Sequence, residues 1–169
     1  MTSLPFSASR PVTREHLDAM WTGVLRALGS LGDPAIALAP PGPRLPAKAP
    51  AAHEISVLVG LGGAVEGQLL VGFSQAQALA LCSRALCVPL ETFDATASAA
   101  LAAIASGMAV ACCEELERAG WTVSASMPSV IAGAGVRVSW PAMYIQEGSF
   151  RYLDQSAYLA LGLRLDQRI

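Results

Sequence analysis

The feature that most constrains this fold is a long stretch, Ala95 to Cys113, that contains no Asp, Glu, Lys or Arg. The stretch is rich in alanine, the strongest helix former, and therefore predicts a single long helix. Asp94 is placed to cap the start of this helix, and Gly120 is placed to end it. Glu114 and Arg118 are four residues apart and are predicted to pair across one turn.

The uncharged stretch is also long enough to be tested as a membrane span. It contains Ala, Ser and Thr rather than Leu and Ile, and no aromatic belt or basic flank accompanies it. We therefore expect a buried helix of a soluble protein and no association with a membrane.

The composition points to one domain and to extra burial. A chain of 169 residues fits a single domain over residues 1–169. Charged residues make up only 14 % of the sequence, whereas globular domains carry roughly a quarter. A surface with so few charged residues is most easily covered in a homodimer. The formal net charge is −2 and Lys48 is the sole lysine, so binding of nucleic acid is not expected.

The cysteines are expected to be reduced and structural. They are Cys82, Cys87, Cys112 and Cys113. The adjacent pair cannot form a strain-free bridge on a helix, and a free cysteine behaves as a small buried hydrophobe. With only His16 and His53 in addition, no metal-ligand spacing emerges, so no metal site is predicted. Reduced thiols and the lack of a secretory signal at the N-terminus favour a cytoplasmic location.

The first third of the chain predicts a helix followed by a linker. Thr13 can cap a helix with a regular apolar stripe from Leu17 to Leu28, and Gly29 and Gly32 would stop it. Residues 33–52 contain six of the eleven prolines. We interpret this stretch as an extended, partly polyproline-like linker without a packed element, and as a spacer more readily than as a ligand for another domain.

The next segment predicts a β-hairpin and a helix. Apolar residues alternate from Ile55 to Leu61 and again from Val65 to Phe73, with Gly62-Gly63 as the turn. The glycines do not form a nucleotide-binding loop: "GLGGAVEG" has valine where GxGxxG needs its last glycine, and it lacks the lysine of a Walker loop. Ser74 and Gln77 form a capping box for a helix from Gln75 to about Cys87.

The last third predicts about three strands. Residues 121–126 alternate, "MPSVIAGAG" is interpreted as a loop or turn, and residues 136–140 form a further strand that "AMYIQ" continues beyond Pro141. Leucines at 159, 161, 163 and 165 end the chain with a regular strand. The order of one helix, two strands, two helices and then strands is typical of an α+β fold, with helices packed on an antiparallel sheet.

This order, together with four phrases, resembles the CheX branch of the CheC/CheX/FliY family of chemotaxis phosphatases. The phrases are "ISVLVGLGGAVEGQLLVGFS", "ALALCSRALC", "SAALAAIASGMAVA" and "SMPSVIAGAG". The resemblance covers the chain from about Thr13 to its end and implies a CheX/CheC-like domain. In that family the long helix carries an E-x-x-N motif. The Asn orients the water that attacks an aspartyl-phosphate on a CheY-type response regulator, the Glu engages the regulator's active-site lysine, and the regulator supplies Mg²⁺.

The family motif falls on "ALAAIAS", residues 100–106, where both functional positions differ. Ala103 stands at the Glu position and Ser106 at the Asn position. The resemblance therefore implies a CheX-like protein that interacts with a receiver or acts as a scaffold without catalysis, and that needs no cofactor of its own.

Two other functions stay open. The first is an active phosphatase that positions water with Ser106 and nearby Ser98. The second, less favoured, is cysteine nucleophilic catalysis, which needs an activating histidine or a positive environment that the sequence does not indicate.

Overall fold

The computed structural model describes residues 12–31, 37–38, 53–133, 138, 140, 143–152 and 155–164. Within these residues the chain forms three helices and one seven-stranded sheet. The helices are α1 (Arg14–Ser30), α2 (Gln75–Leu86) and α3 (Ala95–Arg118). The strands are β1 (Ala37–Leu38), β2 (Ile55–Gly63), β3 (Gly67–Phe73), β4 (Val123–Ala125), β5 (Ser129–Ala132), β6 (Met143–Tyr152) and β7 (Gln155–Arg164). The α+β prediction is confirmed.

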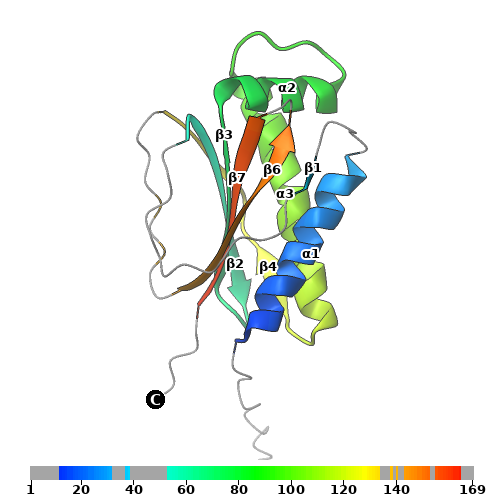
Figure 1. The fold of residues 1–169 in the computed structure, drawn as a ribbon, viewed down its shortest axis with the longest axis vertical. Coiled ribbons are helices and arrows are strands. Elements are labelled where there is room, and N and C mark those ends of the chain that lie inside the picture. Colours follow the sequence, from blue (N-terminus) through cyan, green and yellow to red (C-terminus); the bar gives the residue numbers. More distant parts are fainter. Residues whose placement is uncertain are drawn as a thin grey trace, which may run out of the picture.

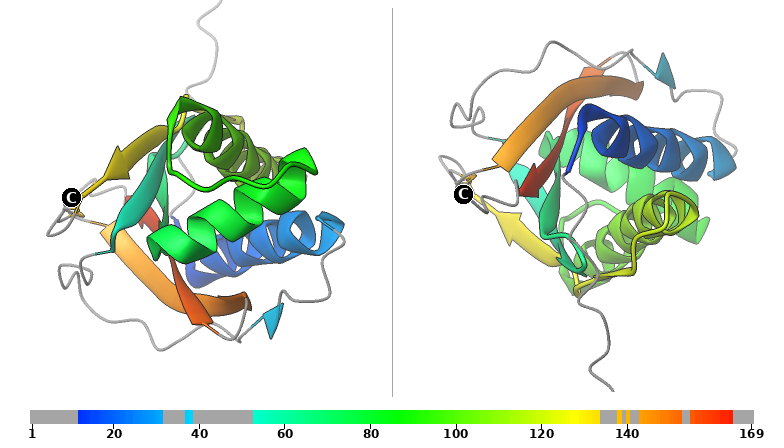
Figure 2. Two further views of the ribbon diagram at one scale, coloured as in Figure 1. Left: turned by 90° about the horizontal axis from the view of Figure 1, so that it is seen from above. Right: turned by 90° about the horizontal axis from the view of Figure 1, so that it is seen from below.

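The sheet is antiparallel throughout, in the order β1-β6-β7-β3-β2-β4, and β5 also pairs with β2. All three helices cover one face of it, as Figures 1 and 2 show. Alternate residues of β3 and β7, among them Val71 and Leu161, form the main core with Leu101 and Met108 of α3. A smaller cluster that contains Leu70 of β3 uses the intervening residues and therefore lies on the opposite face.

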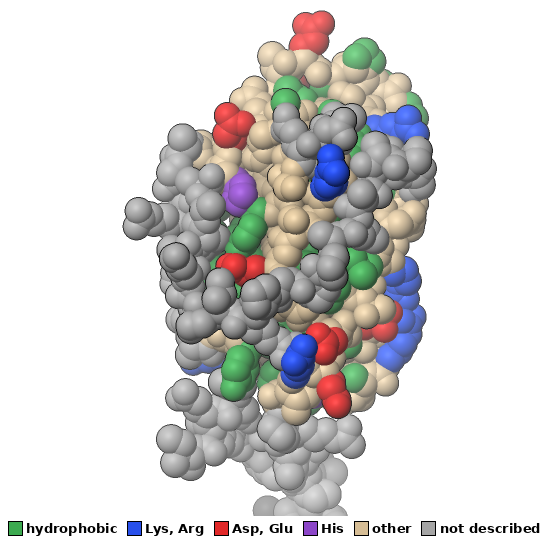
Figure 3. All heavy atoms as spheres, viewed as in Figure 1, with side chains coloured by type: hydrophobic (Ala, Val, Ile, Leu, Met, Phe, Trp, Pro, Cys, Tyr) green, Lys and Arg blue, Asp and Glu red, His purple; other side chains and the backbone are tan. Residues whose placement is uncertain are grey.

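The view in Figure 3 shows how charge is distributed over one side of the molecule. Basic and acidic side chains of the described residues are scattered over this side, both near its outline and toward its middle.

The helix boundaries follow the predicted capping residues. The backbone N–H of Thr13 donates to Nδ1 of His16 (2.9 Å), and Ser74 and Gln77 form the expected capping box. Cys87 ends α2 in the left-handed region with φ 54°. The α1 helix continues through Gly29 to Ser30, so Gly29 does not stop it.

The predicted pair between Glu114 and Arg118 is wrong. Arg118 pairs with Glu115 instead, and Glu114 accepts from Arg26 of α1 at 2.5 Å. The packing of α1 on α3 brings Arg26 between the two carboxylates, because Arg26 also lies 3.2 Å from Glu115. A tertiary contact therefore replaces the local pair that the spacing alone suggested.

The hairpin is confirmed, but its turn is displaced. Gly62 and Gly63 belong to β2, and the connection to β3 consists of residues 64–66. Gly63 has φ +124°, and a Cβ atom there would lie 2.5 Å from the carbonyl oxygen of Thr122. Glycine is thus required by the left-handed backbone and by the close approach of β4, not by a tight turn.

The C-terminal strands differ from the prediction in two places. The predicted loop "MPSVIAGAG" contains β5, which pairs with residues 55–58 of β2. The strand begun in "AMYIQ" continues to Tyr152 across Gly148, where a side chain would meet the ring of Trp21. Val138 and Trp140 are described and are not in a strand, and the rest of 136–140 lies outside the described residues.

Two residues of the proline-rich stretch are described, and they are paired in the sheet. Ala37 and Leu38 form β1, which pairs with residues 150–151 of β6. This part of residues 33–52 is therefore an edge strand of the sheet and not a free linker. The remainder of the stretch lies outside the described residues, so the linker boundaries and the single domain over residues 1–169 stay predictions.

The α3 helix is only partly buried. By length and composition alone, α3 could cross a membrane. The core helix of a soluble protein can have the same length and composition. In this fold α3 packs against α1, α2 and the sheet through residues such as Leu101, Met108 and Leu116. Its opposite side, which includes Ala103, Gly107 and Val110, is exposed. The expectation of a buried helix therefore holds for one side of α3 and fails for the other.

Candidate functional site: the exposed face of α3

The outward side of α3 carries the two positions that the sequence singled out. Ala103 is exposed and Ser106, three residues later, is partly exposed. Residues three apart on a helix are neighbours on its surface. The fold therefore presents positions 103 and 106 together, as a site for a partner requires.

The chemistry at these positions is limited to a methyl group and a hydroxyl. Alanine offers no acceptor for a lysine ammonium, and serine is shorter than asparagine and lacks its carboxamide. Ser98 is partly exposed but eight residues from Ser106, about 12 Å along the helix at 1.5 Å per residue. The two serines therefore cannot act on one water molecule.

The nearest acidic residues of α3 are engaged at the ends of the helix. The Oδ1 atom of Asp94 accepts from the backbone N–H groups of Thr96 (2.9 Å) and Ala97 (3.0 Å). Glu114 is held by Arg26, and Glu115 by Arg26 and Arg118. These carboxylates stabilise the helix and its packing, and none lies within two turns of Ala103.

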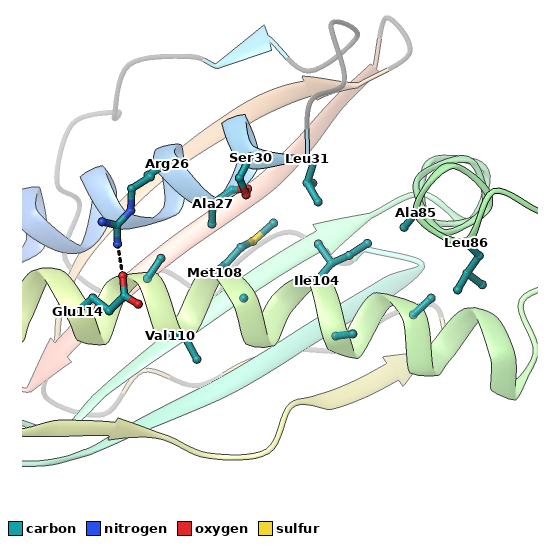
Figure 4. Close-up of a pocket in the computed structure, with 14 residues that line it drawn as sticks. Arg26, Ala27, Ser30, Leu31, Ala85, Leu86, Ile104, Met108, Val110 and Glu114 are labelled. Carbon is teal, nitrogen blue, oxygen red and sulfur yellow. Dashed lines mark hydrogen bonds and ion pairs between the residues drawn. The ribbon is translucent and has the colours of Figure 1, made fainter.

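An apolar groove lies beside Ala103. It has a volume of about 570 Å³ and is walled by the C-terminal half of α1, the end of α2 and the middle of α3. Its lining includes Ala103 and Gly107, together with Leu86 and Val110, residues that are 41 % and 51 % exposed. Figure 4 places Leu86 and Val110 near opposite ends of the cavity, so exposed apolar side chains extend along it. We call this cavity the α3 groove.

The charged residues that line the α3 groove are confined to one end. Figure 4 shows Arg26 of α1 and Glu114 of α3 reaching toward each other, at the opposite end from Ala85 and Leu86 of α2. Ser106 does not line the groove. Of the two motif positions, Ala103 therefore lies in the groove and Ser106 lies outside it.

Sequence reasoning missed the groove although the sequence carries a signal for it. Val110 is seven residues after Ala103, about two helical turns, and so shares its outward side. Val110 thus marks the exposed apolar side of α3 that forms part of the groove.

The cysteines are free, but not all are buried. Cys87 is exposed, so its prediction as a buried hydrophobe is wrong, whereas the other three are buried. Burial raises the pKa of Cys82 to about 11 and raises that of Cys112 further, so both stay protonated at neutral pH. Their Sγ atoms donate to backbone carbonyls of Ala97 and Met20, each at 3.3 Å. These buried thiols are structural.

Neither histidine forms a catalytic pair with a thiol. His16 lies edge-on to the ring of Trp121, and His53 stacks on the ring of Tyr158 with centroids 4.9 Å apart. The Tyr158 hydroxyl donates to Glu147 at 2.8 Å, and burial with this bond raises the pKa of Tyr158. Burial lowers the pKa of His53. Across the described part of the chain, no group of three or more His, Cys, Asp or Glu side chains is arranged to hold a metal ion.

Comparison with solved structures identifies the fold. No family model and no curated protein matches the sequence. A CheC-like superfamily protein from Shewanella sp. PV-4 matches with a TM-score of 0.76 and 16 % identity over 90 % of this chain and 99 % of that one. The chemotaxis protein CheX from Desulfovibrio desulfuricans matches with a TM-score of 0.75 and 20 % identity, over 89 % of this chain and 99 % of that one.

A third solved structure contains a partner. CheX of Borrelia burgdorferi, in a complex with CheY, BeF₃ and Mg²⁺, matches with a TM-score of 0.74 and 20 % identity. The match covers 88 % of this chain and 97 % of that one. Since all three matches extend over nearly the whole of each chain, this protein has the fold of the CheC and CheX chemotaxis proteins.

Proposed function

We propose that this protein is a CheX-like component of chemotaxis or two-component signalling that binds a CheY-type receiver through the exposed face of α3 without dephosphorylating it. The observation that carries the proposal is the placement of Ala103 and Ser106 together on that face, beside an apolar groove. The exposed face and its groove support docking of a partner, whereas neither position carries the carboxylate or amide of the family motif.

The chemistry of phosphoryl transfer explains why such a surface would bind without catalysis. Dephosphorylation of an aspartyl-phosphate depends on positioning a water molecule and stabilising charge. The Ala103 methyl group can do neither, and Ser106 is left as a lone hydroxyl at the site. Each tenfold loss of rate corresponds to about 1.4 kcal/mol of barrier, so losing both groups removes most of the acceleration. The receiver would carry the Mg²⁺, and the proposed place of action is the cytoplasm.

The binding half of this proposal is tested by titration. Each CheY-type receiver of the same genome is held in its active state with beryllofluoride and Mg²⁺, and its fluorescence anisotropy is followed as the protein is added. The unsubstituted chain should bind at least one receiver, and Ala103→Arg should weaken that binding about tenfold or more, because a charged side chain then blocks the face.

The matched control is Ala76→Arg, which adds the same side chain at an exposed position of α2 outside the groove. It should bind like the unsubstituted protein. Equal binding by Ala103→Arg and Ala76→Arg would show that the receiver docks elsewhere, and no binding by the unsubstituted chain to any receiver would refute the proposal.

We further propose that the protein forms a homodimer, as its low charge content favours. Either a sheet edge or α3 could provide the interface. Light scattering at micromolar concentration should give twice the mass of the chain, and the mass of a monomer would remove this part of the proposal.

A further inference from the structure

His53 packs on the face of the sheet opposite the helices. Its ring stacks on the ring of Tyr158 of β7, with centroids 4.9 Å apart and 27° between the planes. Tyr158 belongs to the residues packed against the apolar cluster of that face. Gly72 of β3 pairs directly with Tyr158, and a Cβ atom on Gly72 would be 2.3 Å from Cδ2 of His53. The ring of His53 therefore occupies the space that a side chain at position 72 would need.

This position accepts a neutral imidazole better than a charged one. The Nε2 atom of His53 is buried and has no hydrogen-bond partner in the part of the chain that the structure describes. A neutral ring can carry its hydrogen on Nδ1, but in the charged ring both nitrogens carry one. Nε2 would then present a buried donor without an acceptor, which is unfavourable. Burial accordingly lowers the pKa of His53 from its ordinary value of 6.5.

The charged groups on this face of the neighbouring strands do not offset that cost. β3 contributes only Gly72 to the contact. On β6, Glu147 accepts from the Tyr158 hydroxyl at 2.8 Å. Arg151 follows four residues later on the same face of β6, and its positive charge does not favour a second cation there. No charged neighbour among the described residues therefore holds a proton on His53.

The residue after His53 connects three elements. The carboxylate of Glu54 accepts from the backbone N–H of Gln75 at 2.7 Å, at the first residue of α2. The Glu54 carbonyl oxygen accepts from the N–H of Gly133 at 2.9 Å, directly after β5. β2 begins one residue later, at Ile55. A displacement of His53 therefore acts on the start of α2, the start of β2 and the end of β5.

We propose that His53 is a pH-sensitive switch: the neutral ring keeps His53 and Glu54 against the sheet, and protonation expels the ring and loosens the contacts of Glu54 with α2 and β5. The inference is independent of receiver binding and of the motif positions on α3. A proton binds His53 more tightly once the ring is released or the chain unfolded. The free energy of unfolding is therefore highest above pH 6.5, the ordinary pKa of the group, and falls as the pH drops below it.

His53→Phe tests the titration, because phenylalanine keeps an aromatic ring beside Tyr158 and takes up no proton. It also removes a buried nitrogen without a partner, so the fold is retained. Urea unfolding is measured for both proteins at about pH 7.5 and about pH 5.5. The unfolding constant of the unsubstituted protein, relative to that of His53→Phe, should rise about threefold or more at the lower pH. Equal pH dependence in the two proteins would overturn the proposal.

Amide hydrogen exchange tests where the release acts. The N–H groups of Gln75 and Gly133 donate to Glu54 and should exchange faster in the unsubstituted protein than in His53→Phe at about pH 5.5, and equally at about pH 7.5. Comparison at one pH cancels the intrinsic pH dependence of exchange. Faster exchange spread over the whole chain, with none specific to these two groups, would refute a local switch.

Gly72→Ala should reproduce the released state without acid, because its methyl group displaces the ring of His53. Exchange at Gln75 and Gly133 should then be fast already at about pH 7.5. The matched control is Gly62→Ala on β2, where a Cβ atom meets nothing within 4 Å, and it should leave exchange at these groups unchanged. Equal exchange in the two alanine variants would show that the ring does not restrain Glu54.

The titration of His53 itself is read by NMR in the unsubstituted protein. The chain has two histidines, so the imidazole signal that His53→Phe lacks belongs to His53. Its midpoint should lie below 6.5. A midpoint at or above 6.5 would overturn the proposal, even if His53→Phe failed to fold, and would leave the proposed function untouched.

Discussion

Gly23 of α1 lies directly against the main chain of α3, where a Cβ atom on Gly23 would be 2.5 Å from the carbonyl oxygen of Ala111. The two helices therefore meet at backbone contact. Arg26, one turn further along α1, consequently lies close enough to reach Glu114 across the end of the α3 groove. The width of the groove thus depends on a glycine outside the groove itself.

We expect Gly23→Ala to destabilise the protein because its methyl group must push α1 from α3. The cost should be about 1–3 kcal/mol, the range for overpacking a well-packed core. Thermal unfolding measures it as a lower Tm. Gly29→Ala is the matched control, since a Cβ atom at this exposed position meets nothing within 4 Å. It should raise stability by up to about 1 kcal/mol through helix propensity alone, and a loss as large as that of Gly23→Ala would contradict the account.

Removal of the Asp94 cap should weaken α3 without touching its exposed face. Asp94→Ala leaves the N–H groups of Thr96 and Ala97 without their acceptor, which should cost about 1 kcal/mol in urea unfolding. Asp94→Asn retains a capping oxygen and should cost much less. If receiver binding fell with Asp94→Asn while stability did not, Asp94 would have a role beyond capping.

Cys87 should be the one thiol among the four that an alkylating reagent modifies quickly. It is exposed, whereas burial protects Cys82, Cys112 and Cys113 and raises their pKa values. A raised pKa leaves less reactive thiolate at pH 8. Mass spectrometry after a short pulse of iodoacetamide should show one modified site, and Cys87→Ser should abolish it. Rapid modification of a second cysteine would show that α2 or α3 opens readily.

The pair Ala103→Glu with Ser106→Asn should restore phosphatase activity toward a receiver that binds. The pair returns the carboxylate and amide to one exposed helix face, and it should accelerate loss of the receiver's phosphoryl group about tenfold or more. Either substitution alone should achieve much less, because groups that act together are not additive. No gain from the pair, with binding retained, would show that the receiver approaches α3 in another orientation.

Much of the fold follows from local sequence. Capping residues such as Ser74 and Asp94 set the helix starts, and the alternation in the hairpin set the pairing of β2 with β3. These features were predictable because each depends on neighbours in sequence. The resemblance to CheX was also confirmed at the level of the fold.

The errors share a physical cause, which is contact between segments distant in sequence. Gly63 resembles a turn glycine, but β4 requires it. Residues 129–132 are half-exposed at a sheet edge and carry little alternation, so β5 was missed. The spacing alone pairs Glu114 with Arg118. Its partner in the structure is Arg26 of α1, which is 88 residues away in sequence. The groove beside Ala103 likewise exists only where three helices meet.

The central claim is that α3 holds a receiver without acting on its phosphoryl group. The most direct test is the rate at which phosphate is lost from a CheY-type receiver already shown to bind, measured with and without a saturating amount of this protein. We predict that the rate is unchanged by the unsubstituted chain and raised by the variant with Ala103→Glu and Ser106→Asn. A marked acceleration by the unsubstituted chain would contradict the account, because Ser106 or another group would then perform the chemistry.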